Sequence, residues 1–212
     1  MSSVITATQL HNALLGLCDT IEQQKEYLSD LDGATGDGDH GVNMAKCFRG
    51  VKAKLQTAEN DDVGAVLGLV GLEVMNSVGG AMGALYGTMF INLSSKSSGK
   101  GEVGLNDLAV MFTDALDGVL SIGKAKVGDK TLVDTLTPAV AALEEAARQN
   151  LPLAEGLADF ENAAHKGMES TRDLLAKMGR ASRLGERSIG HIDAGATSCY
   201  LILKAFANAD RQ

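Results

Sequence analysis

Apolar residues recur every three or four positions along most of the chain, which is the spacing of α-helices that bury one face. The first such stretch covers residues 8–31, and the second covers residues 42–55. Six more stretches with the same spacing follow, at about residues 66–74, 85–93, 108–119, 132–143, 153–178 and 196–209. The pattern therefore predicts eight helices.

Local signals place some of the helix boundaries. Asp61 or Asp62 is a suitable N-cap for the third helix, and Asn106 is one for the fifth. Pro138 should kink the sixth helix or mark its true start, and the small, polar residues 94–104 are typical of a surface loop. We find no convincing strand alternation, linker or repeat, and most connections are short. The prediction is one all-α domain over residues 1–212, a bundle of antiparallel helices.

Composition narrows the class of protein. Hydrophobic residues make up 45% of the chain but aromatic residues only 4%, so the core should be aliphatic. The net charge of −8 argues against a general nucleic-acid binder and against binding to an anionic membrane surface. The sequence has no apolar run long enough to span a bilayer and no pattern typical of a signal peptide. Its three isolated cysteines suit a reducing compartment, so a cytoplasmic protein is expected.

Three carboxylates fall within eight residues of one glycine-rich stretch. Asp32, Asp37 and Asp39 are separated by glycines, and neither Lys nor Arg stands between them. Carboxylates this close repel one another unless a proton or a cation lies between them. Their oxygen atoms favour a hard divalent ion such as Mg²⁺, Mn²⁺ or Ca²⁺. A solvated acidic turn is the simpler alternative, because turns rich in Gly and Asp are common.

Four glycine-rich breaks interrupt the helical pattern, at residues 33–41, 79–87, 123–128 and 179–195. They follow the first, third, fifth and seventh predicted helices. If consecutive helices run antiparallel, all four breaks lie at the same end of the bundle. The sequence thus predicts one site assembled from four distant segments, unless a crossover connection intervenes.

Residues 77–83, which overlap the second break, open a helix with exposed amides and small side chains. A helix N-terminus of this kind favours phosphate, although close packing between helices would explain the small residues equally well. Mg²⁺ in proteins commonly binds a few carboxylates together with substrate phosphates. The acidic turn and this helix start together predict a metal and phosphate site, most simply a nucleotide site.

Other polar residues near the breaks are weaker candidates. His40 follows the third carboxylate and could either reach a phosphate or serve in packing. Arg180 lies in a break with two further arginines and suits polyphosphate recognition, whereas a solvated loop is the alternative. Lys130 has the same two interpretations, while Asp129 and Asp134 are expected to hold loop structure. We find no Ser-His-Asp order, zinc spacing or evident protein nucleophile.

Several motifs in order along the chain identify a family. The sequence reads GDGDHGVNM at residues 36–44, SVGGAMG at 77–83, DGV at 117–119, GDKT at 128–131, GRAS at 179–182, GERSIGH at 185–191 and DAGA at 193–196. With these motifs the chain resembles the nucleotide-binding L subunit of bacterial dihydroxyacetone kinases along nearly its whole length. The resemblance implies a barrel of eight antiparallel helices with the nucleotide site at one end.

The resemblance also implies the residues of the site. Asp32, Asp37 and Asp39 are the expected ligands of two Mg²⁺ ions that bridge the nucleotide phosphates. Arg180 is the candidate for stabilising the transferring phosphoryl group, and residues 179–195 are the expected lid. The expected contacts to ADP or ATP are His40, Gly41, Asn43, Ser77, Gly79, Gly80, Ala81, Met82, Gly123, Leu132, Arg180, Asp193 and Gly195.

The resemblance implies partners as well. In the family, a separate K subunit binds dihydroxyacetone, and the L subunit docks onto it and passes on the γ-phosphoryl group. One branch keeps ADP bound and has it rephosphorylated by a phospho-His protein of the phosphotransferase system, whereas the other branch exchanges ATP. His40 and residues 185–191 resemble the first branch. Some family members also bind a transcriptional regulator, which is therefore a further expected partner.

Departures from the family pattern leave alternatives open. Ala84 and Ala194 stand where the family has prolines, Leu132 replaces a common Met, and Gly38 is typical of the ATP-exchanging branch. Without the prolines we expect a looser lid and faster nucleotide exchange. The alternatives are an ATP-exchanging kinase subunit for a related ketose such as a tetrulose, and a metal-dependent phosphohydrolase that uses the same aspartates.

Overall fold

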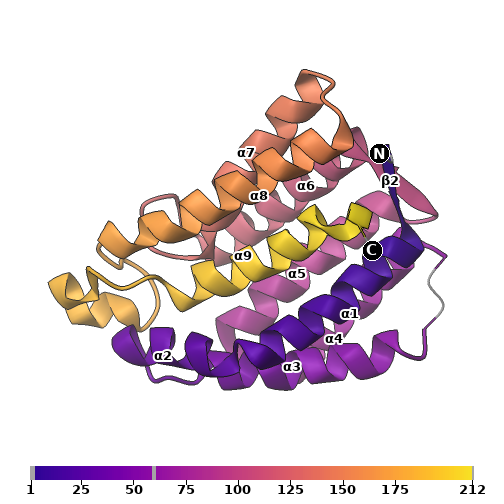
Figure 1. The fold of residues 1–212 in the computed structure, drawn as a ribbon. Coiled ribbons are helices and arrows are strands. Elements are labelled where there is room, and N and C mark those ends of the chain that lie inside the picture. The colour runs from indigo at the N-terminus through magenta and orange to yellow at the C-terminus, as the bar shows by residue number, and fades with distance from the viewer. Residues whose placement is uncertain (1–2, 59–60, 212) are drawn as a thin grey trace.

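The computed structural model describes residues 3–58 and 61–211, and most of this part of the chain is helical (Figure 1). Its short elements are the strands β1 (Val4–Thr6) and β2 (Glu102–Gly104) and the 3₁₀ helices η1 (Thr171–Asp173), η2 (Ala181–Ser188) and η3 (Ala209–Arg211). Its α-helices are α1 (Ala7–Gln23), α2 (Lys25–Thr35), α3 (His40–Leu55), α4 (Val63–Ser77), α5 (Gly80–Ser97), α6 (Leu105–Gly123), α7 (Leu132–Arg148), α8 (Leu153–Ser170) and α9 (Ala194–Ala207). The predicted all-α class is confirmed.

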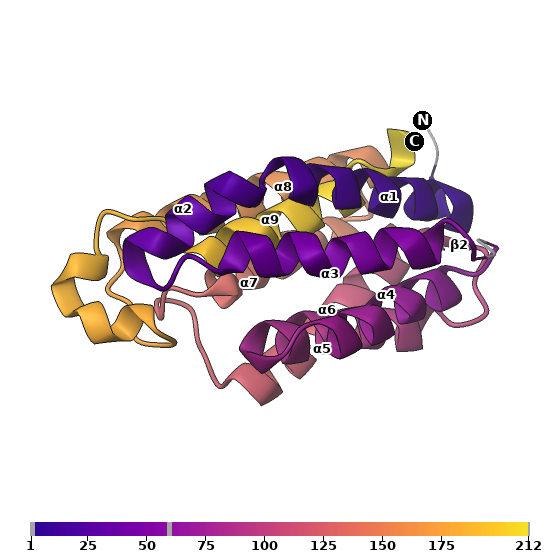
Figure 2. The same cartoon turned by 90° about the horizontal axis from the view of Figure 1, so that it is seen from below.

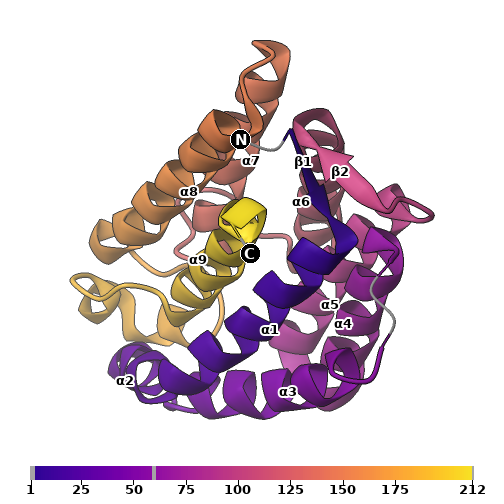
Figure 3. The same cartoon turned by 45° about the vertical axis from the view of Figure 1, so that its right-hand side comes forward.

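Consecutive helices pack side by side, and the last helix closes a ring. From α3 onward each helix contacts the next, and α1 contacts both α3 and α9. The helices α1 and α3–α9 thus surround a common core as a barrel (Figure 3). The shorter α2 follows α1 at one end and contacts α3, α9 and η2. The expected eight-helix barrel is present, with α2 as an additional helix.

The two ends of the barrel differ. At one end lie α2, η2 and the turns that join the helices there (Figures 1 and 2). At the other end β1 pairs antiparallel with β2, and η3 packs against β1 and α1, so the first and last described elements meet there. None of the described helices combines the length and the apolar character needed to cross a bilayer.

The first predicted helix, residues 8–31, is two helices in the structure. Gln24 separates α1 from α2. The apolar pattern does not reveal this break, because Ile21 and Leu28 are seven residues apart and both stay fully buried on either side of it. The second of the two helices also runs further than expected, to Thr35, which places Asp32 in the last helical turn.

The predicted loop at residues 94–104 is only partly a loop. Its first residues continue α5 as far as Ser97, and its last three form β2. A strand of three residues is too short to show alternation in the sequence. The fifth predicted helix begins at Leu105 and is capped at Gly104, not at Asn106, because the Asp107 carboxylate accepts the Gly104 N–H at 3.0 Å.

The seventh predicted helix was expected to reach residue 178, but α8 ends at Ser170. The hydroxyl of Thr171 donates to the carbonyl O of Met168 at 2.7 Å, and η1 begins there. One other boundary prediction holds, since Asp62 caps α4 by accepting the Ala65 N–H at 3.0 Å. Pro138 lies inside α7, which begins at Leu132, so it does not mark the start of that helix.

The core is largely aliphatic, as the composition predicts, but four buried phenylalanines form a cluster within it. The Phe112 ring centroid lies 4.9 Å from that of Phe160 and 5.1 Å from that of Phe206, which in turn lies 6.4 Å from that of Phe90. These rings come from α5, α6, α8 and α9. An aromatic pair contributes about 0.5–1.5 kcal/mol beyond its area burial, so the cluster links four helices of the barrel.

Glycine lets α4 and α5 approach closely at one point. A Cβ atom at Gly64 would lie 2.6 Å from the Cα and 2.7 Å from the N of Ser98, and 2.9 Å from the carbonyl O of Ser94. These are backbone atoms, so they cannot move aside without moving that end of α5. A Cβ at Gly16, on the exposed side of α1, would meet no heavy atom within 4 Å.

We therefore expect Gly64→Ala to lower the free energy of unfolding by about 1–3 kcal/mol through overpacking. Gly16→Ala is the matched control, and it should raise the free energy of unfolding by about 0.5–1 kcal/mol because alanine is the better helix former. Urea unfolding followed by circular dichroism measures both. Similar effects of the two substitutions would contradict the close approach of α4 and α5.

Candidate functional site

A cavity of about 680 Å³ opens at the barrel end that carries α2 and η2. Its walls come from the α2–α3 turn, the α4–α5 turn, the α6–α7 connection and the segment that leads from α8 to α9. These are the four glycine-rich breaks of the sequence. The prediction that they converge at one end of the bundle is confirmed.

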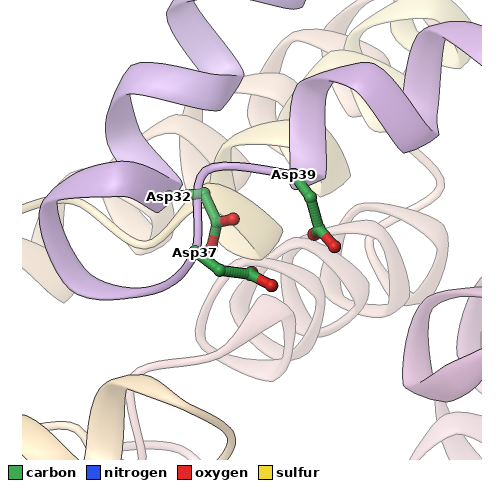
Figure 4. Close-up of side chains that lie close together, drawn as sticks. All are labelled: Asp32, Asp37 and Asp39. Atoms are coloured by element: carbon green, nitrogen blue, oxygen red, sulfur yellow. The ribbon is translucent and has the colours of Figure 1, made fainter.

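The three aspartates of the acidic stretch gather at one side of this cavity, and Asp32 and Asp39 line it. Asp32 lies in the last turn of α2, Asp37 lies in the turn, and Asp39 is the N-cap of α3 (Figure 4). Each offers one carboxylate oxygen, and these oxygens lie within 4.8 Å of one another. Gly38, with φ of +76°, provides the left-handed residue that the turn between them needs. Oxygen donors in this arrangement suit a hard divalent cation.

A cation from a distant segment reaches this cluster. Arg180 comes from the break before α9, and its Nη1 forms an ion pair with Asp37 Oδ1 and lies 3.7 Å from Asp39 Oδ2. The sequence shows no basic residue within the acidic stretch. Arg180 was expected in this site as a phosphate contact, but its pairing with an aspartate 143 positions away was not foreseen. The guanidinium of Arg180 therefore lies beside the carboxylates that a metal ion would bind, and a metal ion would either bind next to it or displace it.

His40 begins α3 and faces the cavity from beside the aspartates. Its backbone N–H donates to Asp32 Oδ2 at 3.2 Å, and its ring Nε2 lies 2.9 Å from the hydroxyl of Ser198 on α9. That hydroxyl lies 2.6 Å from the hydroxyl of Tyr86 on α5, which donates to the carbonyl O of Gly195 at 2.9 Å. Burial lowers the pKa of His40, although the nearby carboxylates of Asp32 and Asp39 oppose this shift.

The α4–α5 turn forms another part of the wall. Gly79, Gly80, Ala81 and Met82 all line the cavity, and Gly80 has φ of +71°. A Cβ atom at either glycine would meet no heavy atom within 4 Å, so the backbone here is open to a ligand. The first amides of α5 lack partners within the helix, which favours an anionic group at this point.

Two of the expected nucleotide contacts do not line the cavity. Ser77 donates its hydroxyl to Glu73 Oε1 on the previous turn of α4, at 2.5 Å. Gly41 is buried where α3 crosses α2, and a Cβ there would lie 1.9 Å from the carbonyl O of Lys25. Glycine at position 41 therefore serves the packing of these helices.

The remaining expected contacts do line the cavity. Asn43 is half-buried on α3, Gly123 ends α6, Leu132 begins α7, and Asp193 and Gly195 lie at the start of α9. Asp193 caps α9 by accepting the Ala196 N–H at 2.8 Å, and burial raises the pKa of its carboxyl to about 6.

An apolar wall completes the cavity and was not foreseen. It is formed by Leu85, Val119, Ile122, Val133 and Met178 together with Leu132. In the sequence these residues belong to the ordinary apolar faces of helices, and nothing in their spacing separates them from core positions. The cavity thus has a polar, acidic side and an apolar side. It suits a ligand with a charged portion and a flat apolar portion.

Lys130 lines the cavity and anchors the segment that carries Arg180. It is buried, and its Nζ donates to the carbonyl O of Thr171 and to that of His191, each at 2.5 Å. It thereby fixes both ends of residues 172–190, the segment that carries Arg180. The expected structural role of Asp134 is seen directly, because its carboxylate accepts the N–H groups of Gly128 at 2.6 Å and Thr131 at 2.8 Å.

Fold and site together define a helical barrel with an acidic, two-sided cavity at one end. Residues 34–208 match the family model described as the DAK2 domain, and the chain belongs to this family. It is 40% identical over 208 residues to the ADP-binding subunit DhaL of the PEP-dependent dihydroxyacetone kinase of Escherichia coli (strain K12), covering 98% of this chain and 99% of the relative. The resemblance stated from the motifs is confirmed.

More distant relatives are longer proteins. The D-erythrulose kinase of Mycolicibacterium smegmatis is 31% identical, and the match covers 91% of this chain but 33% of that protein. The crystal structure of the dihydroxyacetone kinase of C. freundii superimposes with a TM-score of 0.72 at 24% identity, over 94% of this chain and 34% of that one. The same kinase in complex with AMP-PNP and Mg²⁺ gives a TM-score of 0.70. At this identity the structures establish the fold.

We expect Asp37→Asn to weaken the binding of Mn²⁺, used as a spectroscopic substitute for Mg²⁺, because it removes one of three converging oxygens. Loss of a residue that only supports a metal ligand already weakens binding by about 10- to 100-fold, so loss of a ligand should weaken it at least as much. Electron paramagnetic resonance of free Mn²⁺ measures the affinity. Asp30→Asn, which removes an exposed carboxylate of α2 outside the cluster, is the control. Equal affinities of the two variants would contradict the metal assignment.

Arg180→Ala should change metal binding in the opposite direction when no nucleotide is present. The guanidinium competes with the metal for Asp37 and Asp39, and exposed ion pairs are worth about 0.2–1 kcal/mol each, so the affinity for Mn²⁺ should rise about two- to thirtyfold. Arg183→Ala, an exposed arginine in the same segment, is the control. An unchanged or lower affinity in Arg180→Ala would show that Arg180 does not compete with the ion.

Proposed function

We propose that this chain is the nucleotide-binding subunit of a dihydroxyacetone kinase and carries ADP or ATP with two Mg²⁺ ions. The observation that carries the proposal is the two-sided cavity, in which Asp32 and Asp39, with Asp37 beside them, form one side and an apolar wall forms the other. A nucleotide has the matching chemistry. Its phosphates suit the side with the carboxylates, their cations and Arg180, and its base suits the apolar side. The ADP-binding subunit of Escherichia coli, matched over nearly its full length, supports the same conclusion.

The phosphates would lie between the aspartates and the start of α5. Mg²⁺ ions bound there would neutralise phosphate charge and orient the terminal phosphoryl group. The open backbone at Gly79 and Gly80 would accept the phosphates closely, and the unpaired amides of α5 would donate to their oxygens. Leu132 and the other apolar residues would contact the base, which is the part of a nucleotide that is buried away from water.

Arg180 would exchange partners when the nucleotide is loaded. The cations between the carboxylates would replace its guanidinium, which is then available to the transferring phosphoryl group. An arginine can bind phosphate oxygens with two parallel hydrogen bonds and stays charged at all relevant pH values. Catalysis of this kind depends on positioning and on charge stabilisation, and we assign no general base to this chain.

The acceptor would be held by a different chain, a K subunit that binds dihydroxyacetone. The Escherichia coli relative is described as one subunit of its kinase, and this chain covers 99% of it. A phospho-His protein of the phosphotransferase system would rephosphorylate the retained ADP. The relative in Lactococcus lactis, 38% identical, is described as belonging to a PTS-dependent kinase, which supports this donor. A transcriptional regulator remains a further predicted partner.

Exchange of ATP in place of retained ADP is the second candidate. The erythrulose kinases among the relatives match this chain with about a third of their length, and they support a tetrulose as an alternative acceptor. The alanines at positions 84 and 194 favour the same alternative, since they leave the walls of the cavity without the stiffness of proline.

The experiment that tests the proposal is to purify the chain, denature it and identify the nucleotide that is released. We expect about one ADP per chain after gel filtration, because a cavity closed by metal ions and Arg180 should release its ligand slowly. An empty cavity that takes up ATP reversibly would contradict the retained-ADP route and support exchange. Sustained release of phosphate from a phosphorylated substrate by the isolated chain would instead support a phosphohydrolase.

A further inference from the structure

Residues 172–190 leave the barrel at η1 and return to it before α9 through a narrow neck. The N–H of Gly190 donates to the carbonyl O of Arg172 at 2.8 Å. Next to this bond, the N–H of Asp193 donates to the hydroxyl of Thr171 at 3.0 Å. The two ends of the segment therefore lie side by side, and the chain between them forms one surface loop.

Lys130 reaches this neck from a different part of the chain, the connection between α6 and α7. Its buried ammonium donates to the carbonyl O of Thr171 on one side of the neck and to that of His191 on the other, each at 2.5 Å. Two carbonyl oxygens that meet at one buried point need a donor with more than one hydrogen, and a lysine ammonium has three. One side chain thus joins both sides of the neck.

The backbone of Lys130 indicates that this side chain has a role. Lys130 has φ of +62°, in the left-handed region that glycine occupies without strain and that other residues occupy at a cost. Lys124, in the same connection, also has a positive φ, of +56°. Its side chain, however, is exposed and forms no hydrogen bond or ion pair with the described residues. The two lysines share a backbone conformation and differ in what their ammonium groups contact.

Beyond the neck, few bonds fix the position of the segment. Within the part of the chain that the structure describes, its side chains form hydrogen bonds or ion pairs with the rest of the chain at two places. Lys177 donates to the carbonyl O of Gly128 at 2.9 Å and lies near the neck, and Arg180 pairs with Asp37 at the acidic turn. An exposed ion pair contributes little by itself. The position of Arg180 therefore depends on how firmly the neck is held.

Lys130 also lines the cavity, and phosphate binding is the other role for an ammonium in this place. Two of its three hydrogens already serve backbone carbonyls. The two roles differ in one respect that can be measured. A phosphate ligand acts only when a nucleotide is bound, whereas a residue that holds the neck also acts on the chain without a ligand.

We propose that Lys130 is a positioning residue of the site, which binds both sides of the neck and so holds residues 172–190 where Arg180 reaches Asp37 and Asp39. Without its ammonium the segment is free to turn about the neck, and Arg180 spends less time at the aspartates. The contribution of Arg180 to phosphoryl transfer rests on the proposed function. The position of the segment rests only on contacts within the chain.

Limited digestion with trypsin, on the metal-free chain in EDTA, tests the proposal. The cleavage sites within the segment are Lys177, Arg180, Arg183 and Arg187. We expect Lys130→Met to raise the rate of cleavage at these sites at least about tenfold, which corresponds to one lost hydrogen bond to a charged group. Lys124→Met is the matched control and should leave the rate unchanged. Mass spectrometry of the first products identifies the cleaved bonds.

The affinity for Mn²⁺ separates positioning of Arg180 from a general structural role. Because Arg180 competes with the ion, Lys130→Met should raise the affinity at least about twofold, in the same direction as Arg180→Ala. In the Arg180→Ala background the same substitution should lose this effect, since the arginine through which it acts is gone. An effect of equal size in both backgrounds would show that the ammonium acts on the ion through its own charge, and it would overturn the proposal.

Equal cleavage rates in Lys130→Met and Lys124→Met would also overturn the proposal, and so would an acceleration shared by sites throughout the chain. If Lys130→Met does not fold, Lys130→Gln takes its place. Glutamine keeps two hydrogens on a shorter, uncharged side chain, and it should accelerate cleavage within the segment by a smaller factor. The digestion needs neither metal nor nucleotide. A wild-type chain that binds no nucleotide would refute the proposed function and leave the result of the digestion standing.

Discussion

Mutual repulsion among three carboxylates is the constraint on which the site depends. At an effective dielectric of 20, two unit charges 4 Å apart interact by about 4 kcal/mol, so the cluster of Asp32, Asp37 and Asp39 requires a positive charge. In the structure Arg180 supplies it from the far side of the cavity. This ion pair holds the segment between α8 and α9 against the α2–α3 turn. The position of the α8–α9 segment therefore depends on the charge of the α2–α3 turn.

Most of the fold could be predicted because one physical rule governs it. A helix that buries one face repeats its apolar residues every three to four positions, and this chain follows the rule in every barrel helix. The rule fails where a change of direction leaves the buried face unaltered. Ile21 and Leu28 keep the same phase across Gln24, so the break between α1 and α2 has no signature in the pattern. The three-residue strands have none either.

The residues of the candidate site also differ in how well the sequence predicts them. The aspartates and glycines were predictable because carboxylates and residues with unusual backbone angles are conspicuous within a single local stretch. Arg180 was expected in the site, but its pairing with Asp37 was not, and neither were the contacts of Tyr86 and Ser198, since these partners lie more than a hundred positions away. The glycine at position 41 has a packing role that its motif does not reveal. It lies in the most conspicuous motif of the chain, yet a missing Cβ there serves the crossing of α2 and α3.

The separation of the two barrel ends has a consequence for how such a domain is used. Because β1 and η3 meet at the end away from the cavity, any polypeptide joined before or after the barrel starts on the far side from the cavity. In some relatives this chain corresponds to about a third of the length, so the domain also occurs within longer polypeptides. A polypeptide joined to the chain at the opposite end of the barrel therefore leaves the opening of the cavity accessible. A gene fusion can change the stoichiometry of the domain with its neighbours and leave the chemistry of its open end intact.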